Sequence, residues 1–504
     1  MTEPSGNTAP TRDEASYNHI LKYTGLLGGV QVFYVLMAVV RNKLTALFIG
    51  AAGMGLADLY ARTAELVGNT TNLGIGFSAV RRLSALYEEG DTRRMGHYVR
   101  LIRTWTLLTA LLGGAACAVA APLLSRLTTG GGGHTADYAL LAPAVAFATL
   151  TGGELAVLKG IRRLKAMAAI SAVGALATLL ITAPLYWLMG TRGIVPVLVL
   201  TAAATFALNC RAATRHFPYH VTLLRRRFLR QGGHLVRLGG AYIVAGIFGS
   251  GAEMALRACL SRSPGGLEAV GLYAAGFTLT VSYARIIFVA MDADYFPRLS
   301  AAVADRRRLN LTANRQIDVL VLLIVPFLIA FAMALPLIVR LLYTTAFLGI
   351  VPMVVCAAGY MFFKAVFSPV AYLPLAAGHA LTYMAMELAY DVPFVLLVIG
   401  GYRWGGLAGA GLGLSLAGAY NLLLVWACYA RRYGFRPAAP TLRRCLVQGL
   451  WLVAGLVAAW QAAPLPRYGL GAAALLLSLA CSWRLLMQET ALGRIAARFR
   501  HKHH

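Results

Sequence analysis

Long apolar stretches alternate with short polar breaks along almost the whole chain, and each stretch is long enough to cross a membrane. A bilayer-spanning helix needs about 20 mostly apolar residues. The pattern predicts fourteen such helices, near residues 19–40, 45–80, 101–125, 136–158, 166–189, 193–214, 236–260, 267–297, 316–342, 347–375, 379–401, 405–430, 443–463 and 467–488. The chain is therefore predicted to be an all-α polytopic membrane protein.

The composition agrees with this prediction and excludes an ordinary soluble protein. The chain has 504 residues, of which 59% are hydrophobic and 13% are charged, and its mean hydropathy is +0.67. Its seven cysteines show no spacing typical of metal ligands, so they are interpreted as small buried apolar residues. No metal site and no cofactor are predicted. The closing segment, "HKHH", is given no function.

The basic residues are distributed unevenly between the two sides of the predicted membrane. Of the 46 Lys and Arg residues, 34 fall in alternate segments that begin with the N-terminal tail, and nine fall in the opposite turns. The remaining three, Arg62, Arg285 and Lys364, lie at membrane depth. Cytoplasmic loops carry an excess of Lys and Arg, so both termini are predicted to be cytoplasmic. The net charge of +27 is explained by this bias, and nucleic acid is not expected as a partner.

A short internal repeat suggests that the chain contains two copies of one unit. "RLSA" occurs at residues 82–85 and again at 298–301, each time at the end of a predicted helix and before a charged segment. The copies lie 216 positions and six predicted helices apart, so they have the same orientation in the membrane. We therefore predict a pseudo-symmetric arrangement: cytoplasmic tail 1–18, N-lobe 19–214, basic linker 215–235, C-lobe 236–430, appended helix pair 431–488 and basic tail 489–504.

Polar residues form a stripe on the second predicted helix. Asp58, Arg62, Glu65, Asn69 and Asn72 are spaced by four, three, four and three residues, so they share one helix face about 21 Å long. A charged side chain at the bilayer centre costs roughly 2.5–3.5 kcal/mol even on the milder scales. The stripe is therefore expected to face a hydrated cavity.

A second stripe is predicted on the eighth helix, and the repeat places it opposite the first. The 216-residue offset matches Asn69 with Arg285, which lies in a series with Thr278, Ser282 and Asp292. Arg285 has no carboxylate three or four residues away. Unpaired cations at membrane depth indicate either a binding role or a partner on another helix.

Each of these charges also has a purely structural interpretation. Asp58 with Arg62, and Glu253 with Arg257, are four residues apart and could pair within one helix. Lys364 could pair with Glu154, Glu387 or Asp391 on other helices. Glu154 and Glu387 could instead titrate and couple transport to an ion, and Asp58, Glu65 and Glu253 are further candidates for either role.

Prolines and glycines interrupt the later helices. Pro326, Pro336, Pro369, Pro374 and Pro393 each remove a backbone hydrogen bond and allow a helix to bend. The run "GGLAGAGLGLSLAGAY" in the twelfth predicted helix allows close helix packing.

Several blocks of the sequence resemble the Wzx-type polysaccharide flippases of the MOP superfamily. They are residues 21–56, "NLGIGFSAVRRLS" at 72–84, "GLYAAGFTLTVSYARIIFVAMDADYFPRLSAA" at 271–302, and residues 314–347. The resemblance covers about residues 20–435. It implies two six-helix lobes around a central cavity, alternating access, and a lipid-linked oligosaccharide, such as an O-antigen unit, as cargo in a bacterial inner membrane. The appended helices are where some relatives hold the polyprenyl tail.

The candidate residues suit such a cargo. The diphosphate of a polyprenyl-diphosphate-linked glycan needs cationic groups such as Arg62, Arg285 and Lys364, and Asn69, Asn72 and Tyr60 suit sugar hydroxyls. The prenyl tail is best left among membrane lipids. No GxxxxGK[ST] sequence is present, so the energy is expected from a gradient, H+ or Na+ included, from the membrane potential or from product consumption.

Two other functions remain open at this point. A drug or metabolite exporter of the MATE type, coupled to a cation, shares the expected fold and would be favoured by acidic groups in the cavity. A membrane glycosyltransferase or polymerase would be an enzyme, but its catalytic site usually needs sizeable external loops. The longest predicted external turn, "SRLTTGGGGHTADY", carries one acid, Asp137. A transporter without enzymatic activity is therefore expected.

Overall fold

The computed structural model describes residues 12–131, 133–222, 244, 246–282, 285–461 and 464–489. Helices make up nearly all of this part of the chain, and no strand occurs in it. Nine helical segments within it are long and apolar enough to cross a membrane. The chain is therefore a multi-pass membrane protein, and the count of fourteen crossings stays a prediction.

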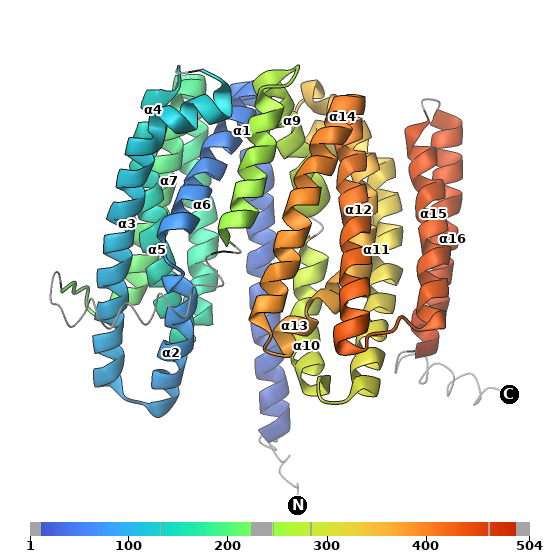
Figure 1. The fold of residues 1–504 in the computed structure, drawn as a ribbon, viewed down its shortest axis with the longest axis horizontal. Coiled ribbons are helices and arrows are strands. Elements are labelled where there is room, and N and C mark those ends of the chain that lie inside the picture. Colours follow the sequence, from blue (N-terminus) through green and yellow to red (C-terminus); the bar gives the residue numbers. More distant parts are fainter. Residues whose placement is uncertain are drawn as a thin grey trace, which may run out of the picture.

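The first half of the chain forms a bundle, here called the N-lobe, on the left of Figure 1. Its helices are α1 (Arg12–Thr71), α2 (Ile75–Glu89), α3 (Thr92–Thr129), α4 (Thr135–Leu140), α5 (Ala142–Gly160), α6 (Leu164–Met189) and α7 (Ile194–Thr214), with the 3-10 turn η1 (Gly190–Gly193) before α7. Packing of α5 against α3, α7 and α2 places α5 within the bundle.

The second bundle, here called the C-lobe, follows on the right of Figure 1. It consists of a helix over residues 246–261, α9 (Gly266–Phe277), the π turn η2 (Thr278–Ser282), α10 (Arg285–Ala302), α11 (Arg306–Leu342), the 3-10 turn η3 (Thr345–Ile350), α12 (Val351–Ala371), α13 (Leu373–Ala376) and α14 (Ala380–Tyr433). Its largest apolar core is built around α11 and α12.

The last two helices, α15 (Ala439–Trp460) and α16 (Pro464–Glu489), pack on each other and on α11. Asp318 of α11 accepts hydrogen bonds from Thr441 Oγ1 at 3.1 Å and from Arg444 Nη1 at 2.5 Å, which fixes α15 to the C-lobe. Between α15 and α16, buried Gln448 bonds to Ser478 and Ser482. Figure 1 shows this pair on the outer side of the C-lobe, away from the N-lobe.

Helix α1 corrects one predicted boundary. The sequence predicts a break at residues 41–44, but α1 is continuous from Arg12 to Ile49, and its non-helical residue is Gly50, with φ 65°. A left-handed φ is accessible to glycine without strain, so the chain turns there. Arg41 and Lys43 therefore lie inside a helix and not in an external turn.

Helix α14 is a close-packed helical hairpin that turns at Gly405 and Gly406. A Cβ built on Gly401 would lie 2.1 Å from the carbonyl oxygen of Gly409, and one on Gly413 would lie 2.3 Å from that of Leu397. No side chain fits at such separations. The Gly-rich run thus serves close packing of the two arms.

The predicted domain boundaries remain predictions, in part because several of them fall in residues that the structure does not describe. Residues 1–11, 223–243 and 490–504 are outside the described part of the chain. Most of the predicted tails 1–18 and 489–504 and of the linker 215–235 therefore cannot be compared with the structure.

Candidate functional site

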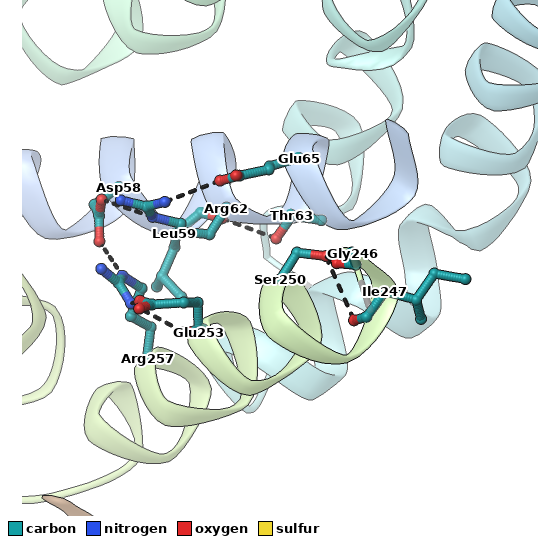
Figure 2. Close-up of polar contacts among 10 residues, drawn as sticks. All are labelled: Asp58, Leu59, Arg62, Thr63, Glu65, Gly246, Ile247, Ser250, Glu253 and Arg257. Atoms are coloured by element: carbon teal, nitrogen blue, oxygen red, sulfur yellow. Dashed lines mark hydrogen bonds and ion pairs between the residues drawn. The ribbon is translucent and has the colours of Figure 1, made fainter. Parts of the chain in front are cut away.

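A chain of alternating charges joins the two lobes at the polar stripe of α1 (Figure 2). Its central group is Arg257, on the helix over 246–261, which is only 1% exposed. Arg257 Nε donates to Asp58 Oδ2 of the N-lobe, and Nη1 donates to Glu253 Oε2. The guanidinium also lies over the ring of Tyr273, at 5.6 Å from its centroid. Arg257 is therefore held by two carboxylates, one from each lobe.

Arg62 continues this series of alternating charges along α1. Its Nε lies 3.6 Å from Asp58 Oδ1, and its Nη1 donates to Glu65 Oε2 at 2.9 Å. Arg62 Nε is buried and has no hydrogen-bond partner in the described structure, although the side chain as a whole is 31% exposed. The order of charges is Glu253, Arg257, Asp58, Arg62, Glu65, and Arg62 is held less tightly than Arg257.

The end of the stripe near Asn72 differs from the prediction. Helix α1 ends at Thr71, so Asn72 lies just beyond it, and Leu73 and Gly74 adopt left-handed conformations. The side chain of Asn72 accepts a hydrogen bond from the backbone of Gly74 at 2.9 Å, which stabilises the turn into α2. Asn69 remains on the same helix face as Asp58 and Arg62, whereas Asn72 has a local structural bond.

Tyr60 does not point towards the interface. It is 1% exposed, and its hydroxyl donates to Asp137 Oδ2 at 2.7 Å and lies 2.9 Å from His134 Nδ1. Tyr60 therefore ties α1 to α4 inside the N-lobe, and its expected role towards sugar hydroxyls is not supported by this geometry.

The C-lobe contributes a second group of charges on α12 and α14. Lys364 lies over the rings of Phe288 and Tyr360, at 5.4 Å and 6.0 Å from their centroids, and it is close enough to Glu387 for the two charges to interact. Asp391, one helical turn beyond Glu387, interacts with Glu387 and with Glu253. This group therefore adjoins the series of alternating charges that contains Arg257.

Glu154 lies apart from these groups, inside the N-lobe. It is 2% exposed and forms a two-pronged ion pair with Arg103, with Nε and Nη2 at 2.8 Å and 2.9 Å from its oxygens. Arg103 also donates to the carbonyls of Phe217 and Pro218. Its geometry gives Glu154 a structural role and leaves the predicted coupling role without support.

The charge balance of the interface is more acidic than the sequence suggested. In the described part of this region, Arg62, Arg257 and Lys364 are opposed by Asp58, Glu65, Glu253, Glu387 and Asp391. The side chains of Ser282, Arg285 and Asp292, which belong to the second predicted stripe, are outside the described residues. The π turn at Thr278–Ser282 also changes the register on which that stripe was based.

Sequence reasoning missed Arg257 as the bridge between the lobes, because a spacing of four residues favoured pairing with Glu253 alone. The repeat does not indicate this bond, but it does indicate where the two lobes meet. Gly55 and Gly271 are 216 positions apart, as are Ala51 and Leu267. A Cβ on Gly55 would lie 1.9 Å from the carbonyl of Leu267, and one on Gly271 would lie 1.9 Å from that of Ala51. Equivalent positions therefore meet each other, as they do on a two-fold axis.

Other contacts join the lobes at this same end of the molecule, near Gly50. Ser261 Oγ donates to the carbonyl of Thr128, and Arg262 donates to that of Arg126. Lys43 donates to the carbonyl of Arg340 at 2.7 Å and to that of Tyr343. The charge bias predicts that this end is external. The lobes are thus closed against each other on the predicted external side.

Comparisons with known proteins agree with this architecture. Residues 233–352 match the family described as "Polysaccharide biosynthesis protein". Among solved structures, the lipid II flippase MurJ in an inward closed conformation has a TM-score of 0.68 at 13% identity, covering 92% of this chain and 99% of that one. The chain has the MOP-superfamily fold. The resemblance predicted from the sequence is thereby confirmed.

Two transporters of this superfamily provide further matches. A multidrug resistance MATE family transporter, in an inward-facing conformation, has a TM-score of 0.65 at 14% identity and covers 80% of this chain and 94% of its own. The MATE transporter VcmN of Vibrio cholerae has a TM-score of 0.53 at 15% identity, with coverages of 81% and 98%. A comparison with curated protein sequences finds no match.

Proposed function

We propose that the protein is a flippase that moves a polyprenyl-diphosphate-linked oligosaccharide, such as an O-antigen or exopolysaccharide unit, from the cytoplasmic to the periplasmic leaflet of a bacterial inner membrane by alternating access. The observation that carries the proposal is the polysaccharide-biosynthesis match over residues 233–352. This segment includes Arg257, the residue that links the lobes. The fold supports a transporter, and the proposal requires no metal or cofactor.

Arg62 is the residue through which the cargo diphosphate would be bound. Its pairing with Asp58 is loose and its Nε is unsatisfied, so it can exchange carboxylate partners for phosphate oxygens. Charge-assisted hydrogen bonds of this kind contribute roughly 1.5–3 kcal/mol each. Arg285 and Lys364 would supply further positive charge from the C-lobe, and Asn69 would contact sugar hydroxyls. The prenyl tail would remain among membrane lipids.

The test is complementation of a strain that lacks the flippase for the glycan concerned. Arg62→Ala is expected to remove or sharply reduce flipping while the protein still accumulates in the membrane, and Arg62→Lys is expected to restore part of it because a single ammonium replaces the two-pronged guanidinium. Arg94→Ala is the control, since Arg94 is 71% exposed and pairs locally with Asp91.

A double variant distinguishes cargo binding from charge neutralisation. If Arg62 only neutralises Asp58, then Asp58→Ala combined with Arg62→Ala restores the activity that Arg62→Ala removes. Because Asp58 also binds Arg257, Asp58→Ala alone is needed as a reference. Full complementation by the double variant at normal expression would overturn the role of Arg62 in binding the cargo.

A cation-coupled exporter of the MATE type is the second candidate function. The observation in its favour is the excess of carboxylates over cations among the described charges between the lobes. In the flippase the same acids, Asp58, Glu65, Glu253 and Glu387, would bind a coupling H+ or Na+. Loss of a resistance phenotype on gene deletion, with glycan export unchanged, would favour the exporter.

A further inference from the structure

A pocket of about 310 Å³ lies inside the N-lobe, among α1, α5, α6 and α7. It lies apart from the charges at the interface, because Asp58, Arg62 and Glu65 do not line it. At this volume it is at the small end of the range for ligand sites. Its lining combines an apolar wall, which includes Met37, Leu155 and Ile170, with several polar side chains.

Arg41 provides the single charge of this lining. It lies nine residues before the turn at Gly50, about 13 Å along the helix from that turn. It forms no ion pair with a carboxylate in the described part of the chain. Since an unpaired cation is costly at membrane depth, an anionic group in the pocket would stabilise the protein.

Four other polar side chains of the pocket, Thr151, Ser171, Thr205 and Asn209, offer hydrogen-bond acceptors to it. The hydroxyls of Thr151, Ser171 and Thr205 each donate to a carbonyl of their own helix, which leaves their lone pairs available. Asn209, which is 3% exposed, donates from Nδ2 to the carbonyl of Thr205 at 2.9 Å. This bond fixes the orientation of the amide, and its buried Oδ1 has no hydrogen-bond partner among the described residues. These acceptors therefore favour a ligand that donates hydrogen bonds.

We propose that this pocket binds a hydroxyl-rich anion of the size of one acidic sugar residue. The negative group pairs with Arg41, and the hydroxyls donate to Asn209 Oδ1 and to the neighbouring threonine and serine oxygens. A simple cation would meet the same oxygens but would be repelled by Arg41, and a simple inorganic anion would leave Asn209 Oδ1 unsatisfied. The chemistry could come from an acidic sugar or from the glycerol phosphate headgroup of a lipid. The inference does not depend on the cargo proposed above.

The experiment measures binding of D-glucuronate to the full-length protein in phosphatidylcholine nanodiscs by isothermal titration calorimetry. Binding should be at least tenfold tighter than that of D-glucose, which lacks the charge, and than that of acetate, which lacks the hydroxyls. Arg41→Gln and, separately, Asn209→Leu should each weaken glucuronate binding about tenfold. Arg192→Gln, a change in the η1 turn outside the pocket, should leave the affinity unchanged.

Each arm of the experiment decides the inference. Equal binding of glucose, equal binding of acetate, or no binding of glucuronate would overturn it, and so would an unchanged affinity in Asn209→Leu, which is informative even if Arg41→Gln fails to fold. Loss of glucuronate binding in phosphatidylglycerol nanodiscs would support the chemistry and assign the site to a lipid headgroup. Because the readout is binding of a free compound, a failure here is separate from a failure of the flipping assay.

Discussion

Arg103 is a basic side chain that is only 1% exposed and donates four hydrogen bonds within the described structure. It pairs with Glu154 of α5 and donates to two carbonyls of the segment that follows α7. The ring of Tyr219 covers its outer face at 4.7 Å. A single arginine thereby connects two helices of the N-lobe with the start of the inter-lobe segment.

Removing this arginine should destabilise the N-lobe strongly. Arg103→Met leaves Glu154 as a buried charge without its partner and releases two carbonyls, and breaking a buried pair typically costs about 3–5 kcal/mol. We expect a marked fall in the melting temperature of the purified protein in detergent, with partial recovery in Arg103→Met combined with Glu154→Leu. Arg94→Met, at the surface, is the matched control. A melting temperature equal to that of the control would contradict this account.

The sequence indicated some of the charged residues between the lobes but not how they pair. The spacing of Asp58, Arg62 and Glu65 correctly placed them on one helix face, because helical periodicity depends only on neighbours along the chain. The bond from Arg257 to Asp58 joins residues 199 positions apart, and no local pattern encodes such a distance. Arg103 was missed for the same reason, since its acid lies 51 positions away.

At the scale of helices, the contact between α1 and α9 depends on two glycines. A side chain at Gly55 would collide with the backbone of α9, which cannot move aside as a flexible side chain could. Gly55→Leu should therefore separate the lobes at the predicted external end. The measurement is the reaction of a single cysteine at Leu59, which is fully buried, with an impermeant maleimide in a background without the native cysteines.

Gly68 offers a control on the same helix, because no atom of the described residues is found within 4 Å of the position where its Cβ would be. Gly68→Leu should leave the cysteine at Leu59 as unreactive as in the parent. Labelling that rises equally in both variants would show that the effect comes from general destabilisation and not from the glycine contact.

The hairpin of α14 allows a similar comparison between adjacent residues. Gly401 meets the backbone of the opposite arm, whereas in the described part of the chain no atom lies within 4 Å of a Cβ at Gly400. Gly401→Leu is expected to cost more than the roughly 1–3 kcal/mol typical of overpacking, because the contact is with backbone. The yield of monodisperse protein should fall for Gly401→Leu and stay near the parent for Gly400→Leu. Equal yields would contradict close packing of the two arms.

Helix boundaries were predicted least well where charged residues within a helix were interpreted as a turn. Arg41 and Lys43 suggested an external loop, but the helix continues to Gly50 because the first is accommodated in a pocket and the second bonds to carbonyls of the C-lobe. The turn itself was signalled only by a glycine. Similarly, the break at residues 72–74 depends on the amide of Asn72 and on left-handed Leu73 and Gly74, which hydropathy does not register.

At the scale of the whole molecule, two patterns in the sequence carried most of the architecture. Apolar length predicted the membrane helices, and the repeat at Arg82 and Arg298 predicted lobes related by an offset of 216 residues. The mutual contact of Gly55 and Gly271 has that same offset. The sidedness of the molecule rests on charge alone.

Both termini and residues 81–100, 211–235 and 298–315 are predicted to be cytoplasmic, since they hold a large share of the basic residues and moving these across the membrane is unfavourable. Figure 1 shows α2 and α4 at opposite ends of the N-lobe. One residue near α2 and one near α4 therefore report on the two sides of the membrane. In a background without native cysteines, Gly131→Cys should react with an impermeant maleimide in intact cells. Arg93→Cys, exposed at the start of α3, should react only after permeabilisation. Labelling of Arg93→Cys, or of single cysteines placed in 211–235, in intact cells would show that the orientation is reversed, and would place the closed end of the lobes on the cytoplasmic side.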